Sequence, residues 1–234
     1  MTAPVEIKVL STTAMKMVFE ALAPDFERDT GNRLAVTLGP SSQLEKRIAE
    51  GEAADVAILA RAGAEQLSVQ GKIMTGSLTD VARSSIGVAV PKGAAKPDIS
   101  TAEAFKRMLL AAKSVAVSKP IGGGQSGVHM AKVFERLGIT EAVQAKAKYG
   151  AGGLAGLVVL RGEADIGIQQ MAELMAVAGI DVVGPLPPDL QSVTTFTAGV
   201  PASASHADAG RAVIAYLTTP AAKVVIKGKG LEPV

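Results

Sequence analysis

The sequence predicts an α/β fold with mixed, largely parallel sheets flanked by helices. Strand-like apolar runs alternate with amphipathic helical patterns along the chain, which is the pattern of βα units. The 25 Gly and 12 Pro residues supply many turns between such units. With 234 residues and 48% hydrophobic residues, the chain can bury a sizeable core, either in one domain or in two small lobes.

Eight strands and seven helices are expected, and they alternate from the N-terminus as far as residue 137. The strands are expected at 5–10, 34–38, 56–59, 85–91, 114–117, 166–168, 180–184 and 194–200. The helices are expected at 15–30, 42–50, 62–70, 101–112, 128–137, 154–161 and 207–217.

Capping signals support three of the expected helix ends. Ser100 precedes Glu103 by three residues, which is the capping-box arrangement for a helix beginning near 101. Gly31 and Gly138 follow helical patterns, where a left-handed C-cap residue is needed.

Two strands give the chain a two-lobe organisation. If the strand that follows Arg83 and the strand over 194–200 are crossovers, residues 1–82 and 194–234 form lobe I. Residues 83–193 then form lobe II, the two strands form the hinge, and a ligand cleft is expected between the lobes.

Composition and charge exclude several classes of function. The net charge of +2 comes from 24 basic and 22 acidic residues without long runs, so nucleic acid is not expected as a partner. The absence of cysteine excludes disulfides, thiolate catalysis and Cys-based metal sites, and aromatic residues that could stack on bases make up only 3% of the chain. No spacing of His, Asp and Glu suits a metal, so neither a metal nor a cofactor is expected. No apolar stretch is long enough to be membrane-inserted.

The most informative segment is the glycine-rich turn within residues 118–130. It reads as a strand end, a turn and a helix start, where exposed backbone N–H groups and a positive helix end can hold an anion. Gly124, Ser126 and Gly127 are its candidate ligand-binding residues, with Ser126 first among them. The alternative is a flexible connection in which the glycines only supply unusual dihedral angles.

Two further hydroxyl-bearing elements could meet the same ligand. Ser11, Thr12 and Thr13 follow the first strand, and Ser41 and Ser42 open a later helix. Serine is also an ordinary helix N-cap, and the two roles are compatible if one hydroxyl caps the helix and the other faces the ligand.

Four segments together resemble the periplasmic solute-binding protein superfamily, in the branch of the molybdate-binding proteins of ABC transporters and the related aconitate isomerase. They are Ser11-Thr12-Thr13 after the first strand, Gly39-Pro40-Ser41-Ser42 with the run over 51–58, the run over 161–168, and the tail over 217–223. The resemblance covers essentially the whole chain and implies the type II fold of this superfamily, in which two lobes close on a ligand.

The resemblance also implies a set of ligand contacts. By position it places Ser11 or Thr12, Ser41 or Ser42, Ser126 and the Gly152-Gly153 turn around an oxyanion. Gln170 stands where this branch has a tyrosine, and an amide suits a carboxyl or hydroxyl group better than a dianion that only accepts hydrogen bonds. Arg83 could grip a carboxylate through two parallel hydrogen bonds, or it is a solvated surface residue.

Two functions follow from these expectations. The first is capture of a small anion, expected to be an organic carboxylate, for ABC-type uptake or for sensing, with an ABC permease as a further partner; a molybdate- or tungstate-type oxyanion is the alternative ligand. The alternative is isomerisation of an unsaturated acid by proton transfer, for which His129 is the candidate base. The resemblance implies a periplasmic protein, whereas the N-terminus does not read as a signal peptide, which leaves the cytoplasm as the alternative.

Overall fold

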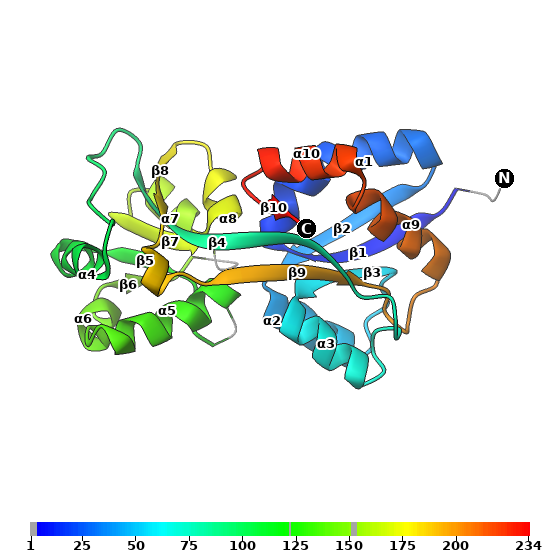
Figure 1. Ribbon diagram of the computed structural model, residues 1–234, viewed down its shortest axis with the longest axis horizontal. Helices are drawn as coiled ribbons and strands as arrows, with labels where there is room; N and C mark the ends of the chain where they lie inside the picture. Colours follow the sequence, from blue (N-terminus) through cyan, green and yellow to red (C-terminus); the bar gives the residue numbers. More distant parts are fainter. Residues whose placement is uncertain (1–3, 122, 151–153) are drawn as a thin grey trace. The chain divides into compact units, whose positions relative to one another are not determined.

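The computed structural model describes residues 4–121, 123–150 and 154–234. The chain divides into two compact units, Met1–Arg83 with Thr194–Val234, and Ser84–Val193. The chain passes between the units twice, inside strand β4 (Thr79–Pro91) and at the start of strand β9 (Val193–Gly199) (Figure 1).

The sheet of the first unit is built around strand β1 (Glu6–Thr12). Strands β2 (Arg33–Gly39) and β3 (Val56–Ala60) pair with β1 on its two sides, and both are parallel to it. Strand β9 pairs antiparallel with β3, and the short strand β10 (Glu232–Pro233) pairs antiparallel with β4. The sheet is therefore mixed, with a parallel βαβαβ centre.

Helices cover both faces of this sheet. They are the 3-10 helix η1 (Thr13–Met15), α1 (Lys16–Thr30), α2 (Ser41–Ala49), α3 (Arg61–Val69), α9 (Ala207–Leu217) and α10 (Pro220–Gly228). Helices α2 and α3 lie on one face, and α1, α9 and α10 lie on the other (Figure 1). The crossover from β1 to β2 through α1 and the crossover from β2 to β3 through α2 run in opposite directions across the sheet. Because such crossovers are right-handed, α1 and α2 fall on opposite faces. Leu44 and Ile48 of α2 and Leu67 of α3 pack against Leu59 of β3 in a buried cluster.

The second unit repeats this plan around strand β5 (Val115–Val117). Strands β6 (Ala147–Lys148) and β7 (Ile166–Gln170) pair with β5 on its two sides, both in parallel. Strand β4 pairs antiparallel with β7 and with β8 (Ile180–Pro185).

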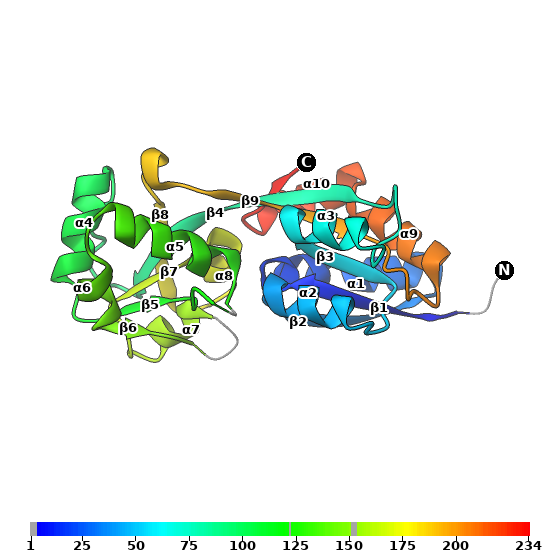
Figure 2. The same ribbon diagram turned by 90° about the horizontal axis from the view of Figure 1, so that it is seen from below.

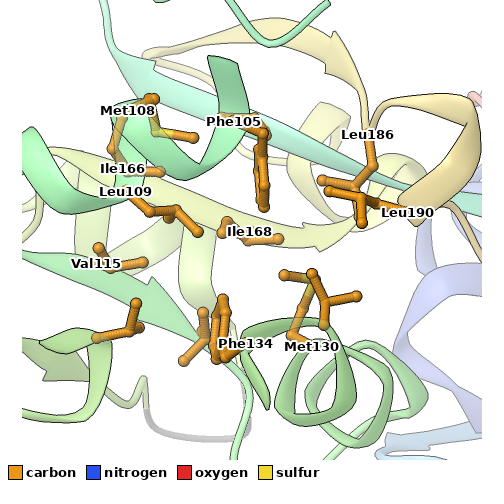
Figure 3. Packing of buried hydrophobic residues seen from close by; sticks show 14 of the residues in the cluster. Phe105, Met108, Leu109, Val115, Met130, Phe134, Ile166, Ile168, Leu186 and Leu190 are labelled. Carbon is orange, nitrogen blue, oxygen red and sulfur yellow. The ribbon is translucent and has the colours of Figure 1, made fainter. Parts of the chain in front are cut away.

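Helices also flank the sheet of the second unit. They are α4 (Ala102–Ala111), α5 (Gln125–Arg136), α6 (Thr140–Gln144), α7 (Ala155–Leu160), α8 (Met171–Met175) and the 3-10 helix η3 (Pro188–Leu190). Helices α4, α5 and α6 lie on one side of the sheet and α7 and α8 on the other (Figure 2). Figure 3 shows Phe105 of α4, Met130 and Phe134 of α5 and Ile168 of β7 pointing into one buried cluster.

The predicted α/β class is confirmed, and several element boundaries are corrected. The hydroxyl that caps α4 belongs to Thr101, which accepts the backbone N–H of Ala104 at 3.1 Å, and not to Ser100. Strand β4 begins at Thr79, before the predicted start at 85, and within this earlier part Ala82 and Arg83 pair with β10. Gly31 and Gly138 have φ angles of 75° and 66°, so both left-handed helix ends are confirmed.

Candidate functional site

Each unit has a topological switch point at the end of its central strand. From β1 the chain crosses to β2 on one side and then to β3 on the other, and from β5 it crosses to β6 and then to β7. In open α/β sheets, ligands bind outside the carboxyl end of the strand at which the strand order reverses. We refer to these two places as the β1 edge and the β5 edge.

Hydroxyl groups from two elements meet at the β1 edge. Ser11 and Thr12 end β1 and are 0% and 5% exposed. Thr12 lies opposite Gly39, the last residue of β2, so the start of α2 follows beside it. The Oγ of Ser41 accepts the backbone N–H of Ala60, the last residue of β3, at 3.3 Å. The fold therefore brings the ends of β1 and β3 and the start of α2 to one edge.

Ser41 is the first residue of α2 and not its N-cap. The N-cap position is occupied by Pro40, which makes no side-chain capping bond. The buried Ser41 hydroxyl instead ties α2 to β3. Ser42 and Thr13 are half-buried at the same edge.

The β5 edge carries the glycine-rich turn and the start of α5. Helix α5 begins at Gln125, three residues before the predicted start, with Gly124 as its N-cap. Ser126 and Gly127 therefore lie in its first turn. The Ser126 side chain is 1% exposed, and its Oγ lies 3.4 Å from the Oγ of Ser118, which follows β5 and is 3% exposed.

Two glycines of this turn, Gly123 and Gly127, are required for close packing and not for unusual dihedral angles. Neither Gly123 nor Gly127 has a positive φ. A Cβ on Gly127 would lie 2.4 Å from the carbonyl oxygen of Lys119, and a Cβ on Gly123 would lie 2.2 Å from the same oxygen. Gly124 has no atom within 4 Å of such a Cβ. The backbone of Ser118 and Lys119 thus holds the start of α5 against the end of β5.

Strand β7 brings two buried glutamines beside β5. Val117 pairs with Ile168, so Gln169 and Gln170 continue β7 alongside Ser118 and are 2% and 4% exposed. The Oε1 of Gln169 accepts the N–H of Ala155 at 2.8 Å and so caps the start of α7. Gln170 ends β7 and precedes α8. The predicted contacts at Gly152 and Gly153 lie outside the described residues.

Arg83 lies in β4, opposite Glu232 of β10. Its guanidinium is 4.0 Å from the Glu232 carboxylate, and its side chain is 42% exposed. The sequence analysis missed a second arginine, Arg61, which begins α3 directly after β3. Arg61 forms an ion pair with Asp80, whose other oxygen accepts the Thr197 hydroxyl at 2.6 Å. These partners are far apart in sequence and share no local motif, so no pattern could have identified them.

His129 contacts a backbone carbonyl and not another polar side chain of the β5 edge. Its Nε2 lies 2.7 Å from the oxygen of Leu190 in η3, and because a carbonyl only accepts, Nε2 donates. This bond ties α5 to η3 within the second unit.

Asp55 and Asp165 precede β3 and β7, at the opposite ends of these strands from the site. Asp55 is 2% exposed and accepts the backbone N–H groups of Lys8 and His206 at 2.9 and 2.7 Å. Asp165 accepts the N–H of Lys113 at 2.8 Å. Both carboxylates therefore have structural partners.

In the described ranges, no group of three or more His, Cys, Asp or Glu side chains could hold a metal ion. Nor does this part of the chain contain a helix of the length and hydrophobicity needed to cross a bilayer. What both edges offer is a set of hydroxyl groups and helix-start N–H groups, which suit an anion.

Comparisons with known proteins identify a family and several relatives of this chain. The chain is 36% identical over 233 residues to an aconitate isomerase from a Pseudomonas species, covering 97% of this chain and 88% of that protein. Its fold is similar to the periplasmic molybdate-binding protein of Azotobacter vinelandii, with a TM-score of 0.80, 22% identity and coverage of 96% and 98% of the two chains. It is also similar to a tungstate-binding protein from Desulfovibrio alaskensis, with a TM-score of 0.66, 17% identity and coverage of 99% of both chains. The model of the bacterial extracellular solute-binding protein family matches residues 7–232, and the chain belongs to that family.

Proposed function

We propose that this protein binds a small organic carboxylate through donors of both the β1 edge and the β5 edge. The observation that carries the proposal is the set of buried hydroxyl groups at the two switch points, Ser11 and Thr12 in one unit and Ser126 in the other. Gln170 supports a carboxylate over a tetrahedral dianion, because its buried amide can both donate and accept. A cleft between the two units is part of the proposal.

The energetics require both edges. A hydrogen bond to a charged group contributes roughly 1.5–3 kcal/mol. Micromolar binding needs about 8 kcal/mol net, after an association cost estimated at about 4–15 kcal/mol. Since the donors of a single edge are too few to reach this sum, we expect a variant at either edge to lose most of the affinity.

A thermal-shift screen tests the proposal. The probes are molybdate, tungstate, sulfate, citrate, cis-aconitate and trans-aconitate, and a probe at 100 times its Kd stabilises the protein by about 2.7 kcal/mol. We expect at least one carboxylate to stabilise the chain, and Ser126→Ala to remove the shift. Ser68→Ala, on the far part of α3, is the matched control and should leave the shift unchanged. Stabilisation by molybdate or tungstate alone would refute the carboxylate assignment.

The second candidate function is isomerisation of the bound acid by proton transfer. The specific observation in its favour is the 36% identity to an aconitate isomerase over nearly the whole chain. Incubation with cis-aconitate and with trans-aconitate, followed by NMR, separates the candidates: a binding protein leaves both acids unchanged. If the protein is a binding protein, an ABC permease is its predicted partner, and docking to such a permease would then be the next measurement.

A further inference from the structure

Glu45 is a titratable residue close to the β1 edge. Neither the proposed carboxylate binding nor the proposed isomerisation has so far been given a role for it. It lies in α2, four residues after Ser41. Its Oε1 atom is fully shielded from solvent and has no hydrogen-bond partner among the described residues. A buried carboxyl oxygen without a partner is costly in a folded protein, so its presence calls for a reason.

The chain makes room for this carboxyl group by placing a glycine opposite it. A Cβ on Gly63 would lie 2.2 Å from Oε1, 2.3 Å from Cδ and 2.8 Å from Cγ of Glu45. Gly63 has no positive φ, so its backbone conformation does not require glycine. The glycine is explained by the carboxyl group that packs on it.

The position of Glu45 relates it to the ligand donors of the first unit. Ser41 and Glu45 are one helical turn apart and share a face of α2. The Ser41 hydroxyl contacts Ala60 just before α3, and Gly63 lies in the first turn of α3. The Glu45 carboxyl group therefore lies between α2, one turn after its start, and the first turn of α3, and both helices begin at the β1 edge.

The basic residues of α2 and α3 are engaged elsewhere. Lys46 pairs with Glu50 at 3.7 Å, and Arg47 pairs with Glu52. Arg61, at the start of α3, pairs with Asp80. Burial raises the pKa of the Glu45 carboxyl group above its usual value, which brings it closer to the range in which a carboxylate exchanges protons efficiently.

We propose that Glu45 is the proton acceptor and donor for a 1,3-proton shift in a bound unsaturated acid; this inference rests on the second candidate function above. The carboxylate takes a proton from the carbon next to the double bond, and the electron pair of that C–H bond forms the new double bond. The electrons of the old double bond take up the proton from Glu45 at the far carbon. Carboxylate and acid are regenerated without an oxidant or a further reactant.

The test measures exchange and binding separately, with trans-aconitate and cis-aconitate as probes in deuterated water. NMR follows both the interconversion and the appearance of deuterium in the acid, and a thermal shift reports binding. We expect Glu45→Gln to slow interconversion and deuterium uptake by about 10²-fold or more, in the range typical of a lost general base, and to change binding only a few fold. Glu45→Asp should retain part of the exchange. Glu65→Gln, on the exposed side of α3, is the control and should behave like the wild type.

Each outcome decides a different question. If the wild type converts aconitate and Glu45→Gln converts it equally well, the Glu45 assignment is wrong and the isomerase function stands. If the wild type binds aconitate but neither converts nor deuterates it, the isomerase function and the Glu45 assignment both fall, while carboxylate binding stands. If Glu45→Gln loses binding as strongly as exchange, Glu45 is a binding residue and the inference is also overturned.

Discussion

Replacing Gly127 with alanine tests the packing that builds the β5 edge. The new Cβ would lie 2.4 Å from the carbonyl oxygen of Lys119 and 2.6 Å from that of Ser118, closer than the 3.0 Å below which real Cβ atoms are essentially never found. Both obstacles are backbone atoms, so the start of α5 must move away from the end of β5. Overpacking of this kind costs about 1–3 kcal/mol.

Part of that cost is offset, because alanine favours a helix over glycine by up to about 1 kcal/mol. We therefore expect Gly127→Ala to lower the stability by about 1–2 kcal/mol. For a chain of this length, that corresponds to a fall in Tm of about 2–8 °C. The displaced Ser126 should also weaken carboxylate binding.

The assay is thermal and urea unfolding of the variant beside a matched control. Gly228→Ala places its Cβ at the end of α10 with no atom within 4 Å and without a positive φ, so it should be neutral or slightly stabilising. The packing argument is refuted if Gly127→Ala melts within 1 °C of the wild type while Gly228→Ala behaves as expected.

Three further substitutions test other parts of the structure. Asp55→Ala leaves two partly buried backbone N–H groups without their carboxylate acceptor and should cost about 2–5 kcal/mol in urea unfolding; a loss below 1 kcal/mol would contradict the assigned structural role. Thr101→Ala removes the α4 cap and should cost about 0.5–2 kcal/mol of stability, more than Ser100→Ala. If Ser100→Ala costs more, Ser100 is the N-cap, as predicted from the sequence. Because burial raises the pKa of Glu45, the contribution of this residue to stability should fall as the pH rises from its unfolded-state pKa through the raised one, so Glu45→Gln should gain stability relative to the wild type over that range. Urea unfolding of the wild type and of Glu45→Gln from pH 3 to 8 measures this difference. Identical pH profiles for the two proteins would contradict the effect of burial on the Glu45 pKa.

The sequence predicted the elements whose signals are local. Strand β1 was recognised from the apolar and polar alternation at its start, β3 from its continuous apolar run, and helix α9 from its eleven-residue amphipathic pattern. The short strands β6 and β10 and the short helices α6 and α8 were missed, since two to five residues carry too little periodicity. Helix α10 was also missed, although Thr219 and Pro220 mark its start.

The residues of the candidate site also differ in whether a local sequence signal marks them. Ser11, Ser41 and Ser126 could be found because each follows a strand or opens a helix, and both are local features. The Arg61–Asp80–Thr197 chain and the Glu45–Gly63 contact depend on which helices and strands the fold places side by side. A glycine that exists to admit a distant carboxyl group has no signature in its own neighbourhood.

Binding and isomerisation make different demands on one scaffold. An anion needs only donors, and the hydroxyl groups and helix starts at the two edges supply them without any titratable group. Proton transfer needs one further group that accepts and returns a proton within reach of those donors. On this scaffold, two residues are sufficient to introduce such a group beside the β1 edge: a glutamate one turn into α2 and a glycine in the first turn of α3 to make room for it. If the proposed isomerisation takes place, the pair Glu45 and Gly63 is the feature that adds proton transfer to anion binding in this chain.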